Sequence, residues 1–130
     1  MAFEEDVLDV TFKAASGLAS TTVNYQYHFV KMSADNEVTI ASGATDAVIG
    51  VLQNKPQTTG SAARVRVFGV TRVVAAGVIA VGTKIGTDGS GHAVAKSANT
   101  NRYLGVLTEA SAGANETPAM LLFGPKIIAG

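Results

Sequence analysis

The chain has 130 residues, no cysteine, and ten acidic against ten basic side chains, so its formal net charge is zero. One domain of this length buries roughly two-thirds of its unfolded surface, so a core is possible without staples. The absence of cysteine excludes disulfides, thiolate zinc sites and cysteine nucleophiles. Balanced charge provides no net field toward nucleic acid or membrane. Only 15% of the residues are charged, against a usual ~25%, which is typical of a surface partly covered in an assembly.

The N-terminal segment combines an acidic cluster with an alternating apolar pattern. Its opening, MAFEEDVLDV, is acidic where a secretory signal is basic, and the longest apolar run, residues 73–81, is half the length that spans a bilayer. We therefore expect a soluble protein. Residues 13–20 (KAASGLAS) predict one helical turn or a flexible join, so residues 1–20 are expected as arm and join and residues 21–130 as one β-domain. The candidate partner-binding residues of the arm are Glu4, Glu5, Asp6, Leu8, Val10 and Phe12.

Period-two alternation continues along the chain, and no long helical pattern appears. Apolar residues alternate with polar ones from Val23 to Phe29, which predicts a half-buried strand. Val38 and Ile40 predict a short strand, closed by the turn cluster ASGATD at 41–46. The class expected from this pattern is all-β.

Two stretches, IGVLQNKPQTTGSAARVRVFG at 49–69 and LGVLTEASAGANETPAMLLFG at 104–124, align without a gap and share five identities in 21 positions. Each predicts a strand, a long polar loop and a second strand ending in Phe-Gly. One such unit cannot bury its apolar face alone, whereas two packed together could close a small barrel or sandwich. Chance similarity between hairpins is the alternative. If the repeat is real, Phe68 and Phe123 are equivalent core residues.

Arg64, Arg66 and Arg72 lie on one side of the strand predicted for residues 64–74, provided that the chain does not bulge at Gly69. They are compatible with a solvated sheet face, with phosphate contacts, or with ion pairs to another subunit, where the planar guanidinium suits carboxylates. No aromatic ladder accompanies them, so nucleic acid is disfavoured. The acidic residues Glu4, Glu5, Asp6 and Asp9 are candidate partners, and a disordered acidic terminus is the alternative.

The remaining motifs indicate turns rather than chemistry. Gly77 and Gly82 bracket a tight turn or a single helical turn, and Asp88-Gly89 is a hairpin signal. The run 86–91 (GTDGSG) lacks the Lys-Ser/Thr of a phosphate loop and the oxygen ligands of a calcium loop. His28 and His92 have no converging partners in the sequence. We therefore expect neither an enzyme nor a bound metal or cofactor.

Several segments together resemble the head decoration, or cement, proteins of tailed phages. They are Tyr27–Lys31, Ile49–Asn54, Val67–Val70, Ala76–Gly82, Thr87–Gly91 and Leu104–Leu107. The resemblance spans about residues 22–124 and depends on the order and spacing of glycines and aliphatics. Thr83 departs from it, because members often carry an acidic residue after that glycine.

The resemblance implies a compact β-domain, which fits the small closed β-barrel or sandwich, β-tulip-like, with a flexible N-terminal arm that the sequence itself predicts. It implies a protein on the outer surface of the virion capsid, made in the host cytoplasm, that stabilises the head by clamping neighbouring major capsid subunits. Its partners would be the major capsid protein and itself, as a homotrimer, without nucleic acid or membrane. The alternating Leu8, Val10 and Phe12, tethered by the join, predict in addition that the arm adds a strand to a capsid subunit or a neighbouring protomer.

Two other classes remain open from the sequence. A stand-alone β-barrel for a ligand such as carbohydrate is disfavoured because tryptophan is absent and only three tyrosines could stack on sugars. A lytic phage enzyme is disfavoured because the sequence has no acid–base constellation.

Overall fold

The computed structural model describes residues 7–43, 46–96 and 102–127. All regular structure in these ranges is β-strand, which confirms the all-β class. The strands join in the order β1-β3-β2-β4-β5-β9-β8-β6-β7. In chain order they are β1 (Leu8–Ala14), β2 (Phe29–Ala34), β3 (Glu37–Ile40), β4 (Val48–Leu52), β5 (Ala62–Arg72), β6 (Lys84–Thr87), β7 (Ala93–Ala95), β8 (Arg102–Leu107) and β9 (Ala119–Ile127).

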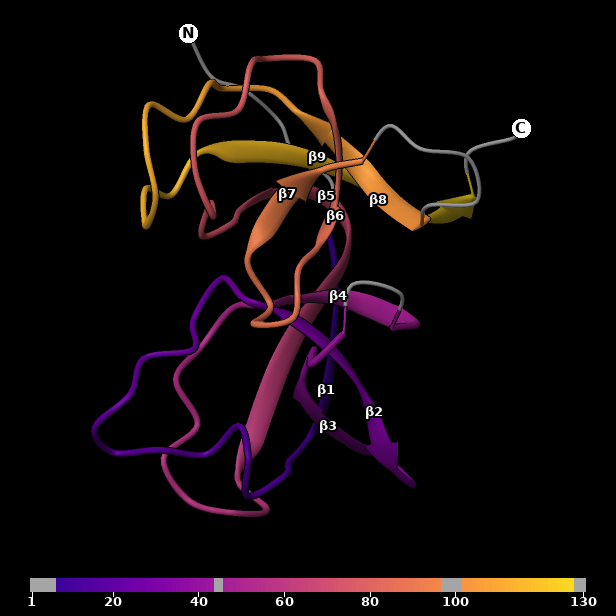
Figure 1. Ribbon diagram of the computed structural model, residues 1–130. Helices are drawn as coiled ribbons and strands as arrows, with labels where there is room; N and C mark the ends of the chain where they lie inside the picture. The colour runs from indigo at the N-terminus through magenta and orange to yellow at the C-terminus, as the bar shows by residue number, and fades with distance from the viewer. Residues whose placement is uncertain (1–6, 44–45, 97–101, 128–130) are drawn as a thin grey trace, which may run out of the picture.

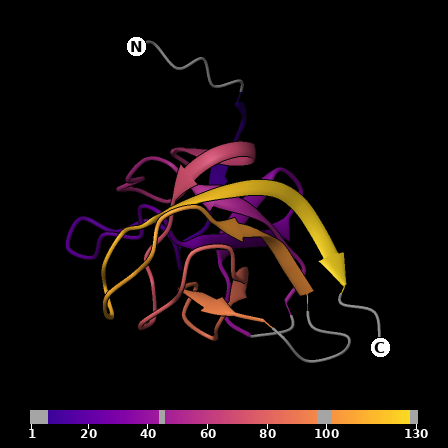
Figure 2. The same cartoon turned by 90° about the horizontal axis from the view of Figure 1, so that it is seen from above.

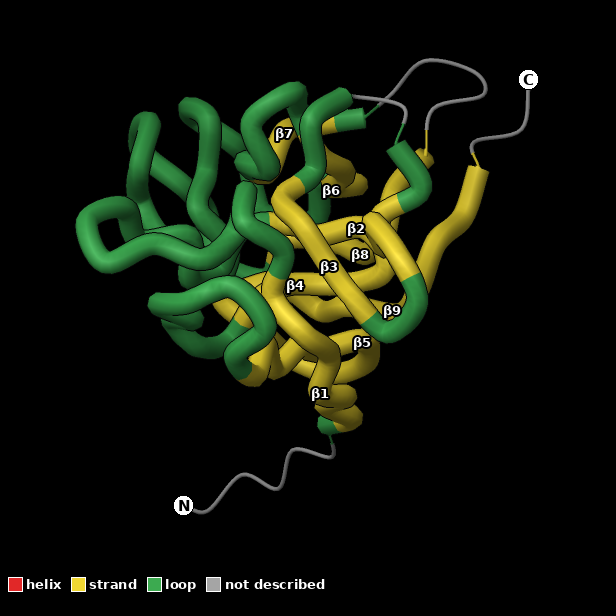
Figure 3. The backbone as a smooth tube through the Cα atoms, turned by 90° about the horizontal axis from the view of Figure 1, so that it is seen from below, coloured by secondary structure: helices red, strands yellow, loops and turns green. Residues whose placement is uncertain are grey.

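The sheet closes twice and forms two small barrels that share β5. In the first barrel β1 pairs with β3 on one side and with β5 on the other, so the cycle β1-β3-β2-β4-β5 is complete. In the second barrel the C-terminal part of β5 pairs with β9, β9 with β8, β8 with β6, and β6 with β7. A bridge between Ala75, just after β5, and Ala93 of β7 closes this cycle. Figure 1 shows the first barrel below the second, with β5 running between them. From above, β9 curves over the second barrel (Figure 2), and from below the long loops gather on one side (Figure 3).

The two barrels are copies of one unit, and the pairing register demonstrates this. Gly50 and Gly105 are 55 positions apart in the sequence, and the same offset relates the pairs of β2, β3, β4 and β5 to those of β6, β7, β8 and β9. The repeat therefore extends well beyond the two similar stretches in the sequence. Val51–Arg66 recurs as Val106–Leu121, Val30–Gly50 as Ile85–Gly105, and Met32–Val38 as Thr87–Ala93.

Strand β1 has its own counterpart, which is the second half of β5. The pair Asp9–Arg66 recurs as Val70–Leu121, and the parallel pair Ala14–Val38 recurs as the bridge Ala75–Ala93. Strand β5 is therefore the last strand of one unit and the first strand of the next.

The backbone turns repeat as well. All residues with positive φ in the described ranges fall into pairs with the 55-residue offset, even where the residue type differs. They are Tyr27 and Gly82, Asn36 and Gly91, Gly60 and Asn115, and Gly69 and Gly124.

Equivalent positions fill the two cores. Each barrel has its own cluster of apolar side chains, and nine positions of the repeated unit contribute to the cluster in both barrels. At these positions the residues of the second barrel are buried, whereas some of those of the first barrel are only half-buried. The pairs are Phe12/Val73, Ala14/Ala75, Leu18/Ile79, Val30/Ile85, Val38/Ala93, Ile49/Leu104, Leu52/Leu107, Val65/Met120 and Val67/Leu122.

The barrels also pack directly against each other. Phe29, Val48 and Val51 of the first barrel belong to the core cluster of the second. The Phe29 N–H donates to the Gly91 carbonyl at 2.9 Å, and the Val74 N–H donates to the Tyr27 carbonyl at 3.1 Å. The described chain is thus one packed unit of two barrels.

The expected flexible arm is wrong for the described part of residues 1–20. Leu8–Ala14 is strand β1, paired with β5 in the same chain from Leu8–Phe68 to Lys13–Ala62. The join makes one helical turn, with the Ala19 N–H donating to the Ala15 carbonyl at 3.0 Å, and Leu18 is buried in the first core. The packing therefore does not separate an arm and join at 1–20 from a domain at 21–130. Glu4, Glu5 and Asp6 lie outside the described residues.

Two further expectations need correction. The strand predicted from Val23 to Phe29 begins only at Phe29, because Tyr27 adopts a φ of 68° that breaks the extended backbone. Phe68 is 51% exposed and is no core residue, and Phe123 is half-buried and contacts the Tyr103 ring edge-on. The Phe-Gly identity marks the left-handed glycines at 69 and 124.

Candidate partner-binding surface

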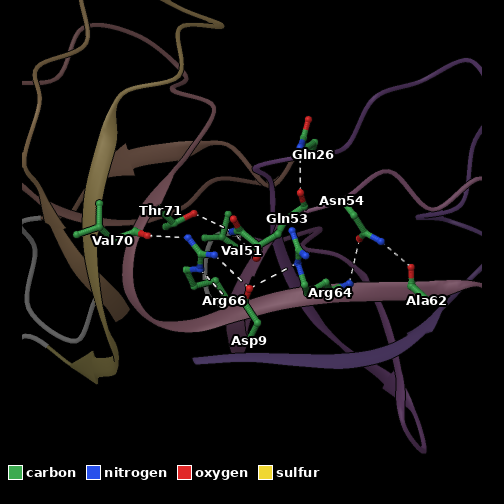
Figure 4. Close-up of polar contacts among 10 residues, drawn as sticks. All are labelled: Asp9, Gln26, Val51, Gln53, Asn54, Ala62, Arg64, Arg66, Val70 and Thr71. Carbon is green, nitrogen blue, oxygen red and sulfur yellow. Dashed lines mark hydrogen bonds and ion pairs between the residues drawn. The ribbon is translucent and has the colours of Figure 1, made fainter. Parts of the chain in front are cut away.

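Asp9 of β1 and two arginines of β5 form the central ion-pair group between the strands. The antiparallel register places Asp9 opposite Arg66, and the Arg66 Nε and Nη2 donate to the two carboxylate oxygens at 2.8 and 3.1 Å. Arg64 Nε lies 3.5 Å from the same carboxylate. The hydrogen bond from Arg66 lowers the pKa of Asp9 below its usual 3.8. Figure 4 shows both guanidinium groups directed at this one acid.

Arg66 also holds the bend of its own strand, since its Nη1 donates to the Val70 carbonyl at 2.9 Å. The bend lies at Gly69, whose φ is 107°. The prediction that the three arginines lie on one side of a strand assumed a regular chain at Gly69. This assumption is wrong, because the chain bends at this glycine. Arg72 lies beyond the bend, and its Nη1 donates to the Thr117 carbonyl at 2.7 Å and lies 3.5 Å from Glu109.

Gln53 connects the two barrels beside this group. It follows β4, is almost fully buried, and its amide nitrogen donates to the Val51 carbonyl at 3.1 Å and to Thr71 Oγ1 at 2.8 Å. The Gln26 amide in turn donates to the Gln53 carbonyl at 2.9 Å (Figure 4). These bonds satisfy a buried polar side chain, whose desolvation would otherwise cost free energy.

A shallow pocket of about 340 Å³ opens at this junction between the barrels. Its lining includes Tyr27, Gln53, Arg66, Thr71 and Arg72. We call it the junction pocket. It is rich in hydrogen-bond donors, and both of its charged residues are arginines, so its chemistry suits a small anionic or polar group.

The predicted apolar residues of the N-terminal segment divide between core and surface. Phe12 packs against the first core. Leu8 and Val10 are 55% and 36% exposed, and Leu8 pairs with the exposed Phe68. The start of β1 therefore presents an apolar edge next to the ion-pair group.

The two histidines lie together, which the sequence did not indicate. Their ring centroids are 4.9 Å apart, and His92 Nδ1 lies 3.6 Å from Asp88 Oδ2. Burial lowers the pKa of His28 below its usual 6.5, and the charge of His92 acts in the same direction. Within residues 7–43, 46–96 and 102–127, no three His, Cys, Asp or Glu side chains gather as metal ligands would, and no helix is long and apolar enough to cross a membrane.

The family profile described as phage cement protein matches residues 3–122. The chain belongs to the phage cement protein family. Its fold is similar to that of a solved structure described as the head fiber gp8.5 N base in bacteriophage phi29, with a TM-score of 0.63 and 19% identity over 90% of this chain and 94% of that one. None of the curated proteins matches.

Membership in this family gives the chain a capsid-associated, structural role in a phage particle. At 19% identity the head fiber base supports the fold, a small all-β barrel structure, over almost the full length of both chains. The cement protein's double barrel is therefore the scaffold on which the junction pocket and the exposed edge of β1 are presented.

Proposed function

We propose that this cement protein decorates the outside of the phage head and stabilises it by clamping neighbouring major capsid subunits. Its family membership is the observation that carries the proposal. The packing supports it, because the two barrels share one strand and pack core side chains against each other, so they form one unit. A protein that holds neighbouring capsid subunits together requires a stably packed fold and does not require a reactive site.

The partner surface that we propose includes the exposed start of β1. Leu8, Val10 and Phe68 form an apolar edge, and the acidic residues Glu4, Glu5 and Asp6 precede it in the sequence. An apolar centre with a charged rim is the usual anatomy of a protein interface. Strand β1 is paired with β5 along one edge and with β3 at Lys13 and Ala14 on the other. It is therefore not the free strand that the sequence predicted, and main-chain pairing with a capsid subunit is not part of this proposal.

The cement protein is proposed to act as a homotrimer without enzymatic activity, cofactor, nucleic acid or membrane. A low charged fraction and zero net charge leave a surface best covered by copies of itself or by the shell. Three-fold symmetry requires head-to-tail contacts, in which one patch meets a different patch on the next subunit. Arg64, Arg66 and Arg72 all have carboxylates within 3.5 Å in their own chain, which favours protein over phosphate as their partner class.

Co-sedimentation tests the proposal. Capsids that lack the cement protein should bind it to saturation and should then withstand heat or low salt for longer than bare capsids. Analytical ultracentrifugation of the free protein, with the stoichiometry on the shell, decides the trimer. A protein that leaves capsid stability unchanged, or that is a monomer both free and bound, would contradict the corresponding part.

A further inference from the structure

The duplication allows the two barrels to be compared residue by residue, and they differ in the residues that line the junction pocket. Tyr27, Gln53 and Arg66 line the pocket. Their counterparts in the second barrel, at the 55-residue offset, are Gly82, Thr108 and Leu121. One copy thus carries an aromatic ring, an amide and a guanidinium where the other has none of these groups.

Tyr27 is the least expected of the three. Its φ is 68°, and its counterpart Gly82 has a φ of 83°. A side chain in the left-handed region is strained, and glycine avoids that strain. The Tyr27 side chain packs against the second core and also lines the pocket. Its retention in this conformation, where the duplicated unit has glycine, makes it a candidate wall of the site.

Charge identifies the kind of occupant. Arg66 is neutralised and held by Asp9. Among the described residues, Glu109 is the one acid within 4.0 Å of the Arg72 guanidinium, at 3.5 Å. Both side chains are more than half exposed. An exposed pair of this kind contributes little free energy, so an incoming carboxylate can replace Glu109 at the guanidinium once an interface excludes water.

We propose that the junction pocket receives an aspartate or glutamate side chain of the capsid subunit, with Arg72 as its ion-pair partner and Glu109 as the internal group that it displaces. This inference rests on the proposed attachment to the capsid. It places the specific polar contact at the junction of the two barrels, where Gln53 and Thr71 already hold the walls together.

Capsid-binding isotherms of matched variants test it. Arg72→Gln should weaken attachment per protomer roughly tenfold or more, because a charge-assisted hydrogen bond is lost. Glu109→Gln should strengthen attachment up to about fivefold, because the competing carboxylate is gone. Arg102→Gln is the control, since Arg102 is also an exposed arginine and belongs neither to the pocket lining nor to the ion-pair group of Asp9. Equal effects of the Arg72 and Arg102 changes, or weaker attachment of Glu109→Gln, would overturn the proposal.

Tyr27→Gly installs the residue of the duplicated unit and should keep a cooperative melt while weakening attachment. Unchanged attachment would remove Tyr27 from the site.

A test without capsids distinguishes failure of the pocket from failure of the proposed function. Glutamate capped at its amino and carboxyl ends is titrated into the protein, and NMR follows the arginine side chains. Weak binding that is lost in Arg72→Gln and absent for blocked glutamine supports a carboxylate pocket even if the wild type fails to bind capsids. No response of Arg72 at all would overturn it. Tight binding of the free compound that capsids do not displace would identify a small-molecule site instead.

Discussion

Replacing Gly50 or Gly105 by alanine probes the duplicated packing. A Cβ at Gly50 would meet the Arg66 carbonyl oxygen, and one at Gly105 would meet the Leu121 carbonyl oxygen, both far inside van der Waals contact. The obstacle is backbone in each case, so the paired strands must move apart. Overpacking of this kind typically costs about 1–3 kcal/mol. For a chain of this size roughly 3–5 °C of Tm corresponds to each kcal/mol.

Urea unfolding and thermal melts measure the loss, and Gly77→Ala is the matched control. A Cβ at Gly77 meets nothing within 4 Å, and its φ is outside the left-handed region, so the change should stay within about 0.5 kcal/mol. The reasoning requires similar losses at Gly50 and Gly105. A loss at only one of them, or two variants as stable as the control, would refute the equivalence of the two barrels.

Three further changes test the fold and its charges. Deleting residues 2–12 removes most of β1 and should abolish the cooperative melt of the first barrel, whereas an unchanged melt would mean that β1 does not close it. Phe68→Ala should cost less than about 1 kcal/mol in urea unfolding because the ring is half exposed; a loss of about 3–5 kcal/mol would mean a buried ring. Burial lowers the pKa of His28 in the folded state, so the unfolded chain binds the proton more readily and stability falls as pH drops below about 6.5. The Tm should therefore decline more between pH 7 and 5 in the wild type than in His28→Asn, and parallel declines would contradict this.

The sequence predicted strands well where one face is buried and the other is solvated. Alternation located β1, β3 and both halves of the repeat, because period two is what a half-buried strand imposes. It failed at residues 23–28, where Tyr25 and Tyr27 pack inward from irregular backbone. Alternation describes which side chains are buried and does not reveal a φ of 68°.

The extent of the duplication was not visible in the sequence for a related reason. Side chains at equivalent positions have diverged, as Phe29 and Lys84 illustrate, while the pairing registers and left-handed turns have stayed. Backbone geometry tolerates many side chains, so it outlasts residue identity.

One part of the candidate site could be predicted from the charged residues in the sequence. The sequence suggested an N-terminal acid as partner for the arginines, and Asp9 fills that role within the chain. Gln53, Thr71 and Tyr27 come together only through the pairing of the barrels, and no local spacing reports such convergence. Alignment of Tyr27 with Gly82 would have been the one available signal.

Imaging capsids with and without the cement protein tests the central claim most directly. We predict added density on the outer surface of the shell, fitted by the double barrel, in contact with at least two neighbouring capsid subunits, and with the junction pocket facing one of them. Density that touches a single subunit, lies inside the shell, or is absent would contradict the account.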